Sequence, residues 1–128
     1  MNWYKTAQDD LEDRLGNCYF LSGRYVTDNQ NSELVHGTIT NRIANRIKRI
    51  NEETKVLEHA WVEYDNTVFD PVMGQEYQKE VYYAIFEAKV IERYNHEEMC
   101  KTMLTYRHWG PWNDQCPPYE DCDLDELV

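Results

Sequence analysis

The sequence predicts a small α+β domain in which one helix packs on a small antiparallel sheet. Residues 18–27 follow the capping residue Asn17 and carry apolar side chains on overlapping turns, which is typical of a helix that covers a sheet. Residues 56–64 and 67–72 are rich in strand-forming side chains. The Asp-Asn pair at 65–66 tolerates the positive φ of a tight turn, so these two segments should form a hairpin.

The rest of the chain supplies further elements of both kinds. Isoleucines at 39, 43, 47 and 50 favour an amphipathic helix over 41–50, although tertiary context can still impose a strand there. Asn95 and Glu98 have the spacing of a capping box, which opens a helix. The expected elements are therefore a short helix over 7–16, a strand over 34–40, a helix over 41–50, a strand over 81–94, either continuous or interrupted, and a helix from Asn95 to about Arg107.

Length and charge indicate one domain with an acidic end. Residues 1–112 fit a single domain of the 128-residue chain, and residues 113–128 hold acidic side chains with no Lys or Arg. We expect a loosely held tail there, unless it folds back over a basic patch or docks a partner. A net charge of −11 disfavours nucleic acid and anionic membranes, and favours a basic or neutral substrate or partner.

The N-terminal residues lack the basic-then-apolar pattern of a secretory signal, and no apolar run is long enough to span a membrane. We therefore expect a cytoplasmic protein with reduced thiols. A zinc site from His96, Cys100, Cys116 and Cys122 is possible in principle. The gap between the last two cysteines is wider than paired zinc ligands usually show, so no metal or other cofactor is expected.

Cys18 is the candidate nucleophile because it starts the predicted helix 18–27. The exposed N–H groups and the dipole at a helix start stabilise a thiolate. The backbone N–H of Cys18 is also a candidate oxyanion donor. A cysteine on such a helix is more often a small buried hydrophobe, so Cys18 needs catalytic partners elsewhere in the chain.

His59 and Asp70 are those partners. A two-residue turn at 65–66 pairs Trp61 with Asp70, which makes His59 and Asp70 diagonal neighbours on one face of the hairpin. Asp70 can then hold the imidazole in one tautomer while its other nitrogen faces the thiol of Cys18.

A helix-starting cysteine, a strand reading His-Ala-Trp-Val-Glu (59–63) and a strand ending Phe-Asp-Pro (69–71) together resemble transglutaminase-like and papain-like cysteine proteins. The chain is more closely similar to small uncharacterised phage and bacterial proteins. These share Leu-Val-His-Gly (34–37) and an ending of the form His-x-Gly-Pro-Trp (108–112), so the resemblance covers most of residues 16–112. It implies a papain- or transglutaminase-like core with Cys18 as nucleophile, His59 as base and Asp70 as orienting acid.

The oxyanion donor departs from the papain pattern. Where papain-like enzymes place a glutamine before the cysteine, this chain has Glu12, which cannot donate when ionised. Asn17, Asn2, Gln8 and Trp61 are candidate substitutes, although none of them matches a motif. His36, beside a glycine on a predicted strand, either contacts substrate or is a structural histidine. The aromatic segment 108–112 either lines a groove or, as we expect, fills the core below the last helix.

Two functions follow from these patterns. The first is a cysteine-dependent acyl hydrolase or acyltransferase that acts on a peptide, isopeptide or amide bond through Cys18, His59 and Asp70. The alternative is a non-catalytic acidic binding or inhibitor protein of the phage type, which occupies a basic protein surface. The first function depends on Cys18, and the second depends on the acidic surface.

Overall fold

The computed structural model describes residues 17–49 and 51–113 of the chain. These residues form five strands and four helices, which confirms the α+β class. In chain order the elements are α2 (Cys18–Asp28), β1 (Glu33–Thr40), α3 (Arg42–Lys48), β2 (Val56–Tyr64), β3 (Thr67–Asp70), β4 (Gln75–Gln78), α4 (Lys79–Ile85), β5 (Lys89–Tyr94) and α5 (His96–Tyr106). The helix expected over 7–16 and the acidic residues from 114 onwards lie outside the described part of the chain.

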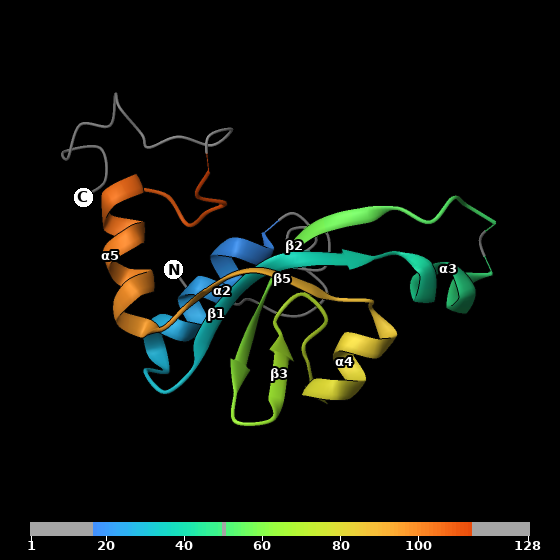
Figure 1. Cartoon of the computed structure of the whole chain (residues 1–128), viewed down its shortest axis with the longest axis horizontal. Coiled ribbons are helices and arrows are strands. Elements are labelled where there is room, and N and C mark those ends of the chain that lie inside the picture. Colours follow the sequence, from blue (N-terminus) through green and yellow to red (C-terminus); the bar gives the residue numbers. More distant parts are fainter. Residues whose placement is uncertain (1–16, 50, 114–128) are drawn as a thin grey trace.

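The sheet is antiparallel throughout, with strand order β4-β3-β2-β1-β5. The long strands β1 and β2 pair along their whole length. Helices α2 and α5 pack on one face of the sheet, while α4 packs on the other (Figure 1). The expected arrangement, a cysteine-bearing helix on an antiparallel sheet, is therefore present.

Two hydrophobic clusters, one on each face of the sheet, form the core. Alternation along β2 sends Ala60 and Val62 to the first cluster and Trp61 to the second. The first cluster consists of Cys18, Leu21, Val26, Leu34, Ala60, Val62, Val72, Met99 and Trp112. The second consists of Val35, Ile39, Trp61, Val68, Tyr82 and Phe86.

Most expected elements are confirmed, with small changes at their ends. β3 ends at Asp70 instead of residue 72, because the chain turns there and the N–H of Gly74 bonds to the carbonyl of Asp70 at 2.8 Å. At the start of α5 the Asn95 side chain accepts the N–H of Glu98 at 2.8 Å, and Glu98 accepts the N–H of Asn95 at 3.0 Å. Both halves of the predicted capping box are therefore formed.

The expectation of a strand over 81–94 is wrong in its first half. Residues 79–85 form the helix α4, and only residues 89–94 form a strand, β5. Tyr82 and Phe86 are four residues apart, and both are buried in the second cluster, as helical periodicity requires. Burial of these two rings against the sheet overrides the strand preference of Val, Tyr and Ile.

Gly37 marks the point where β1 meets β5 irregularly. The register between these strands shifts between His36 and Gly37. A Cβ atom at Gly37 would lie 2.1 Å from the carbonyl oxygen of Lys89 and 2.7 Å from the ring of Trp61. Only glycine lets the two strands approach this closely, which explains the glycine of the 34–37 segment.

The aromatic segment after α5 belongs to the core, as expected. Trp112 is buried in the first cluster, and its indole N–H donates to the carbonyl of His108 at 2.8 Å. A Cβ atom at Gly23 would lie 2.6 Å from the ring of Trp109, so the segment packs directly on α2. None of the helices in the described part of the chain is long and apolar enough to cross a membrane.

Candidate active site

Cys18 is the first residue of α2 and is buried in the first cluster. Asn17 occupies the N-cap position as expected, but its side chain makes no capping hydrogen bond. Its carbonyl accepts the N–H of Leu21 at 2.9 Å, which is the first bond of the helix. The N–H of Cys18 precedes that bond and has no helical acceptor, so it stays a candidate oxyanion donor.

The hairpin has the register that the sequence predicts. Tyr64 pairs with Thr67 and Val62 with Phe69, so Trp61 lies opposite Asp70. The Nε2 atom of His59 lies 2.8 Å from Oδ2 of Asp70. The diagonal pair is therefore a real buried hydrogen bond, with His59 only 7% exposed and Asp70 fully buried.

Asp70 is held by four donors. Its Oδ2 accepts from His59 and, at 2.7 Å, from the hydroxyl of Tyr82. Its Oδ1 accepts the backbone N–H of Val72 at 3.0 Å and that of Met73 at 3.4 Å. A buried carboxylate needs such partners, and these fix it in one orientation towards the imidazole.

His59 contacts both Asp70 and Cys18. Burial alone would lower the pKa of His59, but hydrogen bonds and charge attraction with Asp70 and Cys18 outweigh it and raise the pKa to about 9. Because Asp70 holds Nε2, the nitrogen left for the thiol is Nδ1. Asp70 and Cys18 thus both favour the protonated form of the His59 imidazole.

Trp61 is not available as an oxyanion donor. Its indole N–H donates to Oε2 of Glu63 at 2.8 Å, and the ring is fully buried. This part of the prediction is corrected: the alternation of β2 points Trp61 into the second cluster. Its ring stacks near that of His59, with centroids 6.2 Å apart, so it supports the imidazole from one side.

His36 is buried among aromatic rings. Its ring centroid lies 4.7 Å from that of Tyr19, the residue after Cys18, and 5.0 Å from that of Trp112. Burial lowers the pKa of His36 to about 4, so the ring is neutral at pH 7. Its Nε2 has no hydrogen-bond partner among residues 17–49 and 51–113. These surroundings fit a structural role for His36 better than contact with a substrate.

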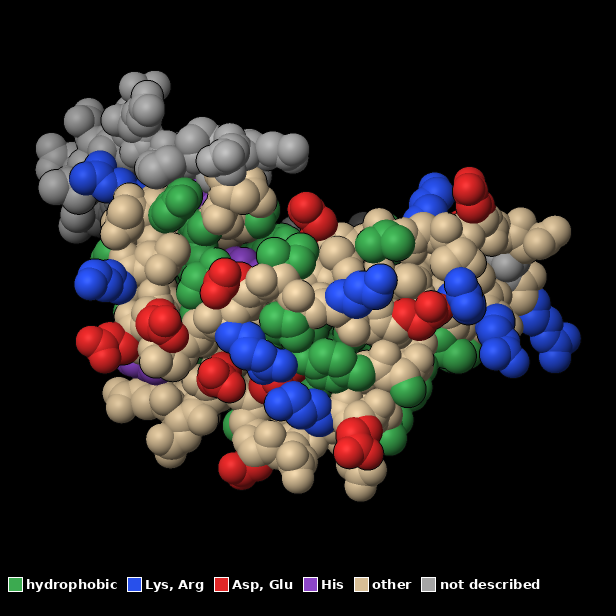
Figure 2. All heavy atoms as spheres, in the orientation of Figure 1, with side chains coloured by type: hydrophobic (Ala, Val, Ile, Leu, Met, Phe, Trp, Pro, Cys, Tyr) green, Lys and Arg blue, Asp and Glu red, His purple; other side chains and the backbone are tan. Residues whose placement is uncertain are grey.

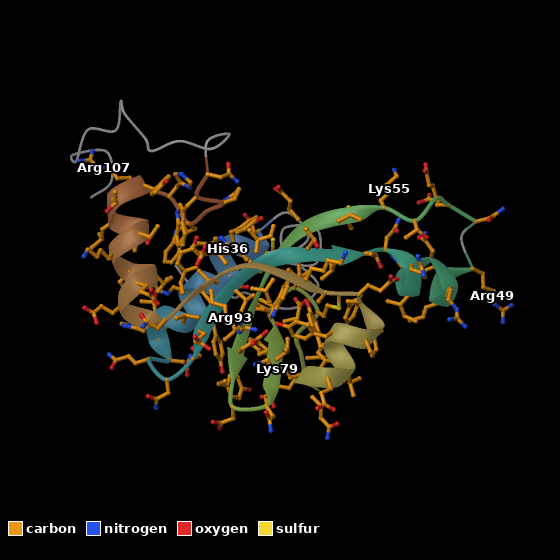
Figure 3. The ribbon with its side chains drawn as sticks, in the orientation of Figure 1. His36, Arg49, Lys55, Lys79, Arg93 and Arg107 are labelled. Atoms are coloured by element: carbon orange, nitrogen blue, oxygen red, sulfur yellow. The ribbon has the colours of Figure 1, made fainter. Side chains whose placement is uncertain are left out.

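Glu63 forms a second buried network two residues beyond Trp61. The carboxylate is 1% exposed and accepts from the Tyr83 hydroxyl, from Arg93 and from Lys79, the last at 3.0 Å. Figure 3 shows Arg93 and Lys79 close to each other beside the strands. These partners outweigh the effect of burial and lower the pKa of Glu63. The network ties α4 and β5 to β2, away from His59.

No metal centre is visible in what the structure describes. The Sγ of Cys100 lies 3.8 Å from Nε2 of His96, and no group of three potential metal ligands occurs within residues 17–49 and 51–113. Cys116 and Cys122 lie outside the described residues, so the four-ligand zinc hypothesis is not tested.

Tyr82 is the site residue that the sequence did not indicate. Residues 81–94 resemble a strand, which hides the helix that aims the Tyr82 hydroxyl at Asp70. The four-residue spacing of Tyr82 and Phe86 is the feature of the sequence that could have indicated a helix here.

Comparisons with protein-family models, curated proteins and solved structures gave no match to this chain.

Proposed function

We propose that the protein is a cysteine-dependent acyl hydrolase or acyltransferase of the papain- or transglutaminase-like type, acting in the cytoplasm on a peptide, isopeptide or amide bond. The observation that carries the proposal is the buried hydrogen bond between His59 and Asp70, with Cys18 near enough to His59 to help raise its pKa. Nucleophile, base and orienting acid are the three parts that thiol acyl transfer needs, and here they come from three separate elements.

In the proposed reaction, the proton that His59 holds is the one that Cys18 gives up, and the raised pKa of His59 favours this transfer. The resulting thiolate attacks the carbonyl carbon. The tetrahedral oxyanion is stabilised by the N–H of Cys18 and by the exposed side chain of Asn17, the residue before it. When the C–N bond breaks, the imidazolium of His59 gives its proton to the leaving amine. Water or a second amine then attacks the thioester, which releases the acyl group and restores the thiol.

The test measures how fast Cys18 reacts with iodoacetamide between pH 4 and 9, followed by peptide mass spectrometry. We expect the rate to stay high well below pH 8.5, the ordinary pKa of a free thiol, because the imidazolium stabilises the thiolate. In His59→Ala the rate at pH 6 should fall at least about tenfold. Cys100 of α5, which is half-buried and lies 3.8 Å from Nε2 of His96, is the internal control in the same digest.

An irreversible substrate-like alkylating probe, such as a peptidyl vinyl sulfone, then separates a merely reactive thiol from one in a site that binds a peptide. We expect one adduct on Cys18 in the wild type and none in Asp70→Ala. The enzymatic proposal is wrong if Cys18 reacts no faster than Cys100 and if the pH dependence of its alkylation rate is the same in wild type and His59→Ala. The alternative of a non-catalytic acidic binding protein would then be the better explanation.

A further inference from the structure

The helix α3 and its flanking residues form a basic arm on an acidic protein. We define the basic arm as residues 41–49 and 51–57. It contains five Lys or Arg residues against two acidic ones, a local charge of +3 in a chain of −11. The basic residues are Arg42, Arg46, Lys48, Arg49 and Lys55, and all of them are exposed. The arm projects from the far ends of β1 and β2 (Figure 1).

Positive charge gathers at this end of the molecule. Figure 2 shows Lys and Arg side chains grouped over the α3 end, with an acidic side chain beside them. Arg49 and Lys55 point away from the body of the protein (Figure 3). Within the described residues, Arg42 pairs with Glu87 at 3.2 Å, and no ion pair involves Arg46, Lys48, Arg49 or Lys55. Most of the arm's positive charge is therefore available to a partner.

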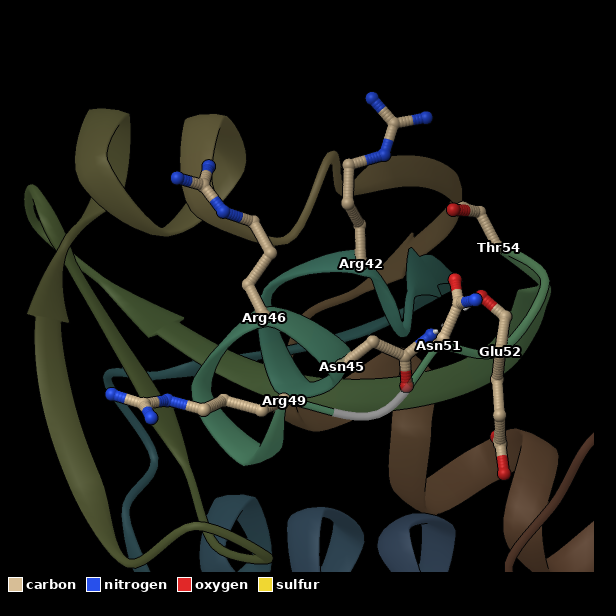
Figure 4. Close-up of a pocket in the computed structure, with 7 residues that line it drawn as sticks. All are labelled: Arg42, Asn45, Arg46, Arg49, Asn51, Glu52 and Thr54. Atoms are coloured by element: carbon tan, nitrogen blue, oxygen red, sulfur yellow. Dashed lines mark hydrogen bonds between the residues drawn. The ribbon is translucent and has the colours of Figure 1, made fainter.

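The arm also has a defined shape. Asn41 accepts the N–H of Lys55 at 2.6 Å, and the Asn45 side chain donates to the carbonyl of Glu52 at 3.3 Å, which ties the returning chain to α3. A hollow of about 380 Å³ lies between these segments (Figure 4). Its lining consists of Arg42, Asn45, Arg46, Arg49, Asn51, Glu52 and Thr54. Three arginines, one glutamate and three residues with amide or hydroxyl side chains thus line one hollow, and the arginine side chains extend outwards from it in different directions (Figure 4).

Exposed apolar side chains lie next to this charge. Ile47 is 75% exposed, Val56 is 69% exposed and Leu57 is 44% exposed. The arm contains no aromatic residue on which a nucleic-acid base could stack. Arginine beside exposed aliphatic side chains is the composition of a protein-binding surface, and guanidinium groups pair well with carboxylates.

We propose that the basic arm binds an acidic segment of a partner polypeptide, with carboxylates at Arg46 and Arg49 and apolar side chains at the exposed Ile47 and Val56. The acidic body of the protein repels such a partner everywhere else, so contact is confined to the arm. The proposal does not depend on the chemistry of Cys18.

The test uses fluorescence anisotropy of a labelled peptide of alternating glutamate and leucine, with a glutamine-for-glutamate peptide as the matched probe. We expect binding of the acidic peptide only, and a loss of binding as salt rises, because exposed charges are screened. The double variant Arg46→Gln/Arg49→Gln should weaken binding by about tenfold. The control Lys101→Gln/Arg107→Gln, with the same change in charge on α5 and at the residue that follows it, should bind as the wild type does.

Two further variants complete the test. Cys18→Ser should bind the acidic peptide normally, which separates this proposal from the enzymatic one. Ile47→Ser should weaken the acidic leucine peptide more than polyglutamate. The proposal is overturned if the acidic peptide does not bind, if both double variants weaken it equally, or if a single-stranded oligonucleotide binds the arm more tightly than the peptide.

Discussion

The hydroxyl of Tyr82 and Nε2 of His59 meet on the same oxygen of Asp70, at 2.7 and 2.8 Å. Tyr82 belongs to helix α4 and His59 to strand β2, so the Asp70 carboxylate joins this helix to this strand. A carboxylate that already accepts a phenol hydrogen has little freedom to rotate away from the imidazole. Tyr82 is therefore a positioning residue for the candidate site.

Tyr82→Phe should weaken that positioning. The change removes one hydrogen bond to a fully buried carboxylate, so we expect the free energy of unfolding to fall by about 1–3 kcal/mol in urea denaturation. Alkylation of Cys18 at pH 6 should slow as well. Tyr83→Phe is the matched control, because the Tyr83 hydroxyl bonds to Glu63 instead. Tyr83→Phe should lower the free energy of unfolding but leave the alkylation rate of Cys18 unchanged. If both variants slow alkylation equally, Tyr82 has no specific positioning role.

Asp70→Asn should change the ionisation of His59. The substitution keeps the size of the side chain but removes the carboxylate that helps raise the pKa of His59 to about 9. We expect the pKa of His59 to move towards its ordinary value of about 6.5, measured by NMR titration of the imidazole protons. His36 provides the internal control, because burial alone lowers its pKa and that should not change. An unmoved His59 titration would contradict the arrangement.

The raised pKa of His59 predicts a loss of stability at alkaline pH. The folded state binds the His59 proton more tightly than the unfolded state does. Its contribution is therefore fully present below about pH 6.5 and is lost as pH rises through about 9, with an upper limit of roughly 3 kcal/mol. Urea denaturation from pH 6 to 10 measures it. The difference between wild type and His59→Gln should shrink across this window, and a constant difference would exclude the linkage.

Gly37→Ala should destabilise the sheet. The new Cβ would fall 2.1 Å from the carbonyl oxygen of Lys89 and 2.7 Å from the Trp61 ring, so β5 or Trp61 must move. We expect a loss of about 1–3 kcal/mol in the free energy of unfolding, read from thermal or urea denaturation. Gly74→Ala, at a positive φ in a turn, is a comparison for backbone strain without this collision between strands. A neutral Gly37→Ala would show that the strands are less closely packed.

The hairpin was predictable because a two-residue turn fixes register. Once residues 65–66 form the turn, the pairing of Trp61 with Asp70 follows from strand geometry alone, and the structure has that register. The capping box at Asn95 was predictable for a similar reason, because it depends only on residues that are close together in the sequence. Residues 79–85 were not predictable in this way, since their strand-like composition is overridden by burial of Tyr82.

The basic arm was not predicted from the sequence for a different reason. A net charge of −11 describes the whole chain, and it hides a local excess of Lys and Arg around α3. Only the arrangement of that segment at the far end of β1 and β2 separates its charge from the acidic body. Averages over the chain indicated an acidic protein, and the structure shows where this description fails.

The hairpin register also has a consequence for how the site assembles. His59 and Asp70 are 11 residues apart in the chain, so a short loop brings them together at a small entropic cost. Cys18 lies much further back in the chain, on α2, which packs against β2. Bringing the thiol to the imidazole therefore closes a longer loop, at a larger cost in chain entropy, than pairing His59 with Asp70.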